Sequence, residues 1–104
     1  MMEKQKKFEL VISELAEQEL NASTDFYNER REGLGNKFLT EIGKTISRIT
    51  VAPEQFPKIK NKQVRKAHVA RFPFGIFFAT KGSIINVLAV FHQSRNPNKL
   101  SKRF

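Results

Sequence analysis

The chain has 104 residues, of which 39% are hydrophobic, so it is long enough for one domain with one core and too apolar to be disordered. It has no cysteine, which excludes disulfides and thiolate metal sites. No apolar run approaches the roughly 20 residues of a membrane helix, and residues 1–7 are charged with no signal-peptide segment behind them. We therefore expect one cytoplasmic domain over residues 1–104, with no metal, cofactor or membrane partner.

Charge is distributed unevenly along the chain, whose formal net charge is +9. Residues 1–54 contain all ten acidic residues and eight Lys and Arg, which gives 8 − 10 = −2. Residues 55–104 contain eleven Lys and Arg and no acidic residue, which gives +11. A segment this basic favours a surface that binds a polyanion or an acidic protein. The alternative is a basic half that aids solubility and binds nothing specific.

The first predicted elements are a short strand and a helix. Phe8–Ile12 alternates in a strand-like way, with three apolar side chains on one face: Phe8, Leu10 and Ile12. Ser13 is a residue type that caps helices by accepting a bond from a free backbone N–H. Gly33 and Gly35 end this helix, because glycine adopts the left-handed cap conformation at little cost.

A second helix is predicted from about Asn36 to Ala52. Its apolar residues step along one face at intervals of three and four: Phe38, Ile42, Ile46, Ile49 and Ala52. Pro53 stops it, because proline lacks the N–H and disfavours helix in the residue before it. The short link between the two helices predicts an antiparallel helical hairpin.

Three strands follow where the apolar period changes: Val64–Phe72, Phe74–Thr80 and Ile84–Phe91. Pro73 favours a break between the first two, and Lys81–Ser83 suits a hairpin loop with Gly82 free for positive φ. Residues 55–63 are interpreted as a loop, and residues 96–104 as a basic C-terminal tail.

The element order predicts an α+β fold: an N-terminal strand, a helical hairpin, then a three-stranded antiparallel meander. We expect the first strand to join the same sheet, the hairpin to cover one face, and function to lie on the other face with Lys66 or His68. Which alternate residues of that strand point toward the core is left open. Two pairs compete for the core: Ala67 with Val69, and Ala70 with Phe72.

Several short segments, in order over residues 13–97, resemble the RelE/ParE family of toxins. They are Glu14-Leu15-Ala16, Phe26-Tyr27, Gly33-Leu34-Gly35, Phe38-Leu39, Pro53–Pro57, Arg71-Phe72-Pro73-Phe74 and Val87–Pro97. No single segment is specific, and their shared order and spacing carry the resemblance. It implies the toxin subunit of a type II toxin–antitoxin (plasmid stabilisation) system. Such a toxin arrests growth unless a cognate antitoxin protein binds it, and the two can form a higher assembly.

The family has two activities: the RelE branch cuts messenger RNA on the ribosome, whereas the ParE branch inhibits DNA gyrase. A metal-independent ribonuclease must activate the 2′-hydroxyl, stabilise the phosphate and protonate the leaving oxygen. By position, the catalytic residues of a RelE-like enzyme would be Lys66, His68 and Arg95. Gly75 and Ser101 stand where such enzymes carry an arginine and a tyrosine. The resemblance therefore favours a ParE-like gyrase inhibitor, keeps a RelE-like nuclease as the alternative, and leaves open whether the protein is an enzyme.

The residues expected to bind a target or an antitoxin are Lys66, Arg71, His92, Arg95 and Arg103. Because the strands of a meander are neighbours, we expect Lys66, Arg71 and Arg95 to converge on one patch. Each has a structural alternative: the two histidines as ordinary half-buried side chains, Arg71 as support of its turn, and Arg95 as an anchor of the tail. A third function left open is a non-toxic, basic nucleic-acid-binding domain.

Overall fold

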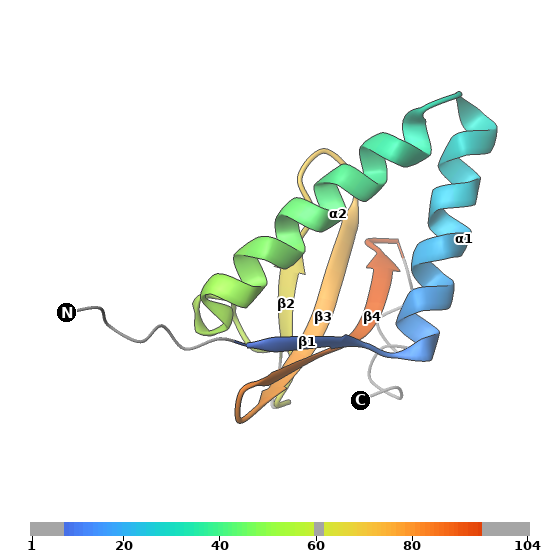
Figure 1. Cartoon of the computed structure of the whole chain (residues 1–104). Helices are drawn as coiled ribbons and strands as arrows, with labels where there is room; N and C mark the ends of the chain where they lie inside the picture. Colours follow the sequence, from blue (N-terminus) through green and yellow to red (C-terminus); the bar gives the residue numbers. More distant parts are fainter. Residues whose placement is uncertain (1–7, 60–61, 95–104) are drawn as a thin grey trace.

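The structure is a computed structural model that describes residues 8–59 and 62–94. Its elements are β1 (Glu9–Ile12), α1 (Glu14–Arg30), α2 (Leu34–Val51), the 3-10 helix η1 (Pro53–Gln55), β2 (Arg65–His68), β3 (Phe74–Lys81) and β4 (Ile84–His92). The sheet has the order β1-β4-β3-β2, with β1 parallel to β4 and the other pairs antiparallel. In Figure 1, α2 passes in front of β2 and β3, and α1 lies beside β4. The predicted α+β fold and meander are confirmed.

The helical hairpin forms as predicted, with a small shift at its turn. Ser13 caps α1, because its Oγ accepts the N–H of Ala16 at 3.1 Å. Gly33 has φ of 85° and is the N-cap of α2. The left-handed glycine reverses the chain at once, so α2 begins at Leu34 and not at the predicted Asn36.

The main core lies between the hairpin and the sheet. The predicted apolar face of α2 is confirmed, with Phe38, Ile42 and Ile49 buried. Ile12, predicted on the same strand face as Phe8 and Leu10, is 37% exposed, whereas those two pack against the core, because β1 is an edge strand that ends at Ile12 before α1 begins. The sheet contributes to this core Ala67, Val69, Phe74, Ile76, Phe78, Ile85, Val87 and Val90.

Strand β2 is shorter than predicted, because it ends at His68 and not at Phe72. The chain turns over the next five residues, where the N–H of Val69 donates to the carbonyl of Phe74 at 3.0 Å. Arg71 within this turn has φ of 70°, a left-handed conformation that a strand does not contain. The parity is also settled, because Ala67 and Val69 are buried in the core and Lys66 and His68 alternate with them.

The segment predicted as a loop starts with η1 and then runs beside β2. Lys58 forms an isolated antiparallel bridge with Arg65, and the N–H of Lys66 donates to the carbonyl of Pro57 at 3.1 Å. The tail predicted at residues 96–104 lies outside the described residues. No helix within residues 8–59 and 62–94 has the length and apolar character needed to cross a membrane.

Candidate partner-binding surfaces

Lys66 lies on the sheet face that points away from the main core. Its Nζ is 5.6 Å from the centroid of the Phe77 ring, and its stem passes over Gly75. A Cβ placed on Gly75 would lie 2.7 Å from Lys66 Cε. Glycine at position 75 therefore leaves the space that the Lys66 side chain fills, at the position where RelE-like enzymes carry an arginine.

The same face carries a second apolar cluster, made of buried Val64, Phe77, Ala89 and Phe91. A register shift at Phe77/Phe78 brings Ala89 opposite Phe77. The sequence signal for this cluster is the nearly continuous apolar character of β3 and β4. Apolar and polar residues alternate in a strand that is buried on one face, whereas a strand buried on both faces is apolar throughout.

The two histidines lie on different faces of the sheet. The side chain of His68 is on the Lys66 side and exposed, and its carbonyl oxygen accepts a bond from Arg48 Nη2 at 3.5 Å. The ring of His92 packs against Phe74 of the main core, with centroids 5.2 Å apart. Its Nδ1 is 2.8 Å from Ser94 Oγ and accepts the N–H of Ser94 at 3.0 Å. The structure does not bring His68 and His92 into one site.

Arg71 points toward helix α2. Its Nε lies 3.8 Å from Oε2 of Glu41, and Lys44 Nζ lies 3.7 Å from the same oxygen. Lys66, in contrast, lies on the opposite face of the sheet beside Phe77. The structure therefore separates Lys66 from Arg71, contrary to the convergence expected from the sequence. Two other expected binding residues, Arg95 and Arg103, lie outside the described residues.

A pocket of about 260 Å³ lies where Arg71 meets α2. The aromatic cluster beneath it positions Phe72, whose ring is 5.0 Å from Tyr27 and 5.3 Å from Phe38 by centroid. Burial raises the pKa of the Tyr27 hydroxyl above its usual value of 10.0. The pocket is lined by Lys37, Thr40, Glu41, Arg71 and Phe72.

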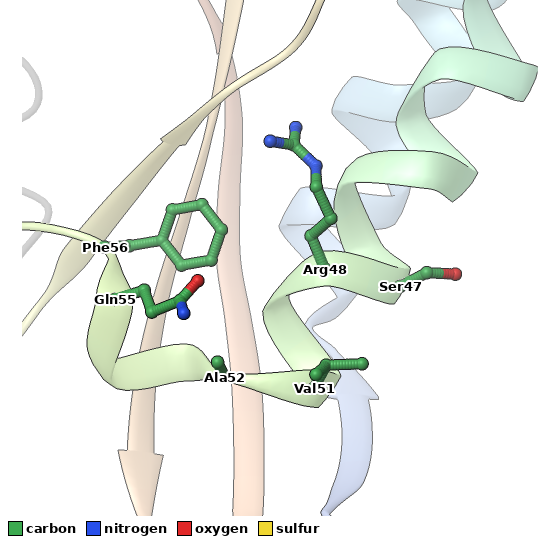
Figure 2. A pocket seen from close by; sticks show the side chains of 6 residues that line it. All are labelled: Ser47, Arg48, Val51, Ala52, Gln55 and Phe56. Carbon is green, nitrogen blue, oxygen red and sulfur yellow. The ribbon is translucent and has the colours of Figure 1, made fainter.

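A second groove, of about 370 Å³, lies at the C-terminal end of α2. Figure 2 shows the Arg48 side chain and the Phe56 ring directed into the space between α2 and the sheet, whereas Ser47 points away from Phe56. Phe56 is held in place by Arg65, whose Nη1 donates to the Phe56 carbonyl at 2.6 Å, and by its ring contact with Phe78 at 5.8 Å. The lining residues are Ser47, Arg48, Val51, Ala52, Gln55 and Phe56.

Sequence reasoning missed the α2 residues that line these two depressions. Glu41, Arg48 and Val51 look like members of a solvated helix face, because their neighbours come from segments distant in sequence. Within residues 8–59 and 62–94, no group of three or more His, Asp or Glu side chains is arranged to hold a metal ion.

Comparisons with known proteins identify the family. The family model for the ParE toxin of the type II toxin–antitoxin system parDE matches residues 10–97. A solved structure described as the chromosomal ParDE toxin–antitoxin system from P. aeruginosa has the same fold, with a TM-score of 0.74 and 21% identity. That match covers 84% of this chain and 97% of the other. A comparison with curated protein sequences finds no match. Since the family model covers most of its length, the chain belongs to the ParE toxin family of type II toxin–antitoxin systems.

Proposed function

We propose that this protein inhibits DNA gyrase in the cytoplasm and is neutralised by a cognate antitoxin. The observation that carries the proposal is the match to the ParE toxin family over residues 10–97. The resemblance of this chain to that branch implies gyrase as the target. A toxin of this kind acts by binding its target, so it needs no catalytic groups.

The arrangement of the sheet supports a binding protein over a ribonuclease. Of the residues expected in a RelE-like enzyme, Lys66 and His68 share one face, but glycine stands at position 75 and Lys66 fills the space above it. His92, the other histidine of the chain, lies on the opposite face against Phe74.

An antitoxin partner is supported by charge and by the structural neighbour. Residues 55–104 carry +11, which an acidic partner would neutralise. The similar solved structure is described as a ParDE toxin–antitoxin system. An antitoxin bound to the basic surface of this protein would block its contact with gyrase. The antitoxin would neutralise the toxin through that competition.

Two assays with the purified protein test the proposal. We expect inhibition of gyrase supercoiling, and no cleavage of messenger RNA in a translating extract. Cleavage of the message with supercoiling untouched would assign the protein to the nuclease alternative. Normal growth of cells that express the protein at a high level, with neither effect in vitro, would favour the non-toxic nucleic-acid-binding alternative.

A further inference from the structure

One flank of helix α2 carries a row of cations, which we call the α2 stripe: Lys37, Lys44, Arg48 and, from the turn after β2, Arg71. Lys44 and Arg48 follow Lys37 by seven and eleven positions, which is close to two and three helical turns. The three side chains therefore lie on one side of α2. The side chains of Lys44 and Arg71 are 68% and 80% exposed.

Glu41 organises the middle of this stripe. It is the only acidic residue of α2 and is 9% exposed. Its Oε2 lies 3.7 Å from Lys44 Nζ and 3.8 Å from Arg71 Nε, so two largely exposed cations lie beside one buried carboxylate. Four cations and one carboxylate leave the stripe with a net charge of +3.

Each end of the stripe opens into an apolar depression. At the Lys37 end, the ring of Phe72 lines the pocket that also contains Arg71. At the other end, Val51 and Phe56 line the groove beside Arg48, and Val51 is 81% exposed. The distance along the helix axis from Lys37 to Val51 is about 21 Å, at about 1.5 Å per residue.

We propose that the α2 stripe binds an acidic, amphipathic segment of a partner protein. Carboxylates of that segment would pair with the row of cations, and apolar side chains at its two ends would enter the depressions at Phe72 and Val51. The identification of this partner as the antitoxin rests on the proposed function, whereas the chemistry of the surface does not depend on it.

The stripe fits a protein better than a nucleic acid. The cations of the stripe would attract a phosphate backbone and a row of carboxylates alike, so the apolar residues at its ends decide between the two. A largely exposed valine at the end of a cationic row adds nothing to phosphate binding, but it matches the apolar anchor of a peptide segment.

A synthetic peptide pair provides the test. The first peptide has about 15 residues, enough for a helix of about 21 Å, with leucines near both ends and glutamates between them on the same face. The second has glutamine in place of every glutamate. Both carry a fluorophore, and binding to the full-length protein is measured by fluorescence anisotropy at several salt concentrations. We expect the glutamate peptide to bind at least about tenfold more tightly, with a difference that shrinks as salt rises.

Three protein variants locate the binding on the stripe. Lys44→Ala and Val51→Ser should each weaken binding of the glutamate peptide by about tenfold or more, through a lost carboxylate contact and a lost apolar anchor. Lys81→Ala removes an exposed cation at the far end of β3 and should bind like the wild type. Melting temperatures verify that every variant is folded.

The outcomes separate this proposal from its rivals. Equal binding of the two peptides, failure of both to bind, or equal loss in Lys81→Ala and Lys44→Ala would overturn it. A single-stranded oligonucleotide that binds more weakly to Lys44→Ala but normally to Val51→Ser would make the stripe a nucleic-acid surface. Because gyrase is absent from the measurement, a negative result here leaves gyrase inhibition standing. A failure of the supercoiling assay equally leaves the peptide result intact.

Discussion

Asn28 near the end of helix α1 caps the start of helix α2: its Oδ1 accepts the N–H of Gly35 at 2.8 Å. The N-cap of α2 is Gly33, which has no side chain to accept such a bond. Asn28 supplies the missing acceptor from the preceding helix and so couples the two arms of the hairpin. A Cβ on Gly35 would lie 2.5 Å from the Asn28 side chain, so glycine at this position permits the close approach.

The Asn28–Gly35 contact predicts strongly non-additive stability effects. Gly35→Ala should lower the free energy of unfolding by about 1–3 kcal/mol, because it displaces the acceptor and leaves a buried N–H unpaired. In the Asn28→Ala background the same change should cost little, since the clash is gone and alanine favours helix over glycine by about 1 kcal/mol. Urea denaturation of the wild type, the two single variants and the double variant measures this coupling. Additive losses would show that Asn28 does not limit position 35.

The raised pKa of Tyr27 predicts a loss of stability in alkaline solution. The folded protein holds the phenol proton more tightly than the unfolded chain. The contribution of Tyr27 to the free energy of unfolding is therefore fully present below the unfolded pKa of about 10. It is lost as pH rises through the folded pKa. Tyr27 is the only tyrosine and the chain has no tryptophan, so phenolate absorbance reports this one group.

The native protein should therefore titrate at higher pH than the same protein in denaturant. Tyr27→Phe keeps the ring contacts with Phe38 and Phe72 and provides the control. Its stability should depend less on pH above about 10 than that of the wild type. Coincident titration curves in the native and denatured states would contradict the burial of this hydroxyl.

The elements that the sequence predicts well are those with local signals. The spacing of Phe38, Ile42 and Ile49 predicts the buried face of α2, and Ser13 predicts the start of α1. The full length of β2 was not predictable, because nothing in the sequence marks Arg71 for a left-handed conformation that arginine seldom adopts.

The candidate surfaces depend on contacts between distant segments, and sequence periodicity carries no information about those. Glu41 meets Arg71 thirty residues later, and Val51 and Phe56 share a groove because the chain turns at Pro53. The expected convergence of Lys66 with Arg71 failed for the same reason: the turn after β2 sends Arg71 toward α2 and leaves Lys66 on the other face.

Gly75→Ala should displace Lys66 without unfolding the protein. The added Cβ would overlap Lys66 Cε, which lies near the free end of a flexible side chain and can move away. We expect the free energy of unfolding to change by less than about 1 kcal/mol, because alanine also restricts the unfolded chain. If Lys66 contacts gyrase from its position over Phe77, Gly75→Ala should weaken inhibition of supercoiling about as much as Lys66→Ala does.

The double variant separates the position of Lys66 from its charge. Gly75→Ala combined with Lys66→Ala should inhibit gyrase no less than Lys66→Ala alone, because both changes act through one side chain. Full inhibition by Gly75→Ala with loss in Lys66→Ala would mean that the charge matters and its placement over Phe77 does not.

Arg71 should matter more for partner binding than for stability. Its left-handed backbone costs roughly 1–2 kcal/mol in a non-glycine residue, and its ion pair with Glu41 involves an 80% exposed side chain that contributes little after screening by water. Arg71→Gly relieves the strain at the cost of a more flexible unfolded chain, so the free energy of unfolding should stay within about 1 kcal/mol of the wild type. Affinity for the cognate antitoxin should nevertheless fall by about tenfold or more, as a charge-assisted contact is lost.

Two further variants are the controls. Arg71→Lys keeps the charge in the strained turn and should retain part of the affinity, and Lys81→Ala removes one positive charge elsewhere. Calorimetric titration and urea denaturation of the same samples decide the matter: a large loss of stability in Arg71→Gly with unchanged affinity would make Arg71 a structural support of its turn.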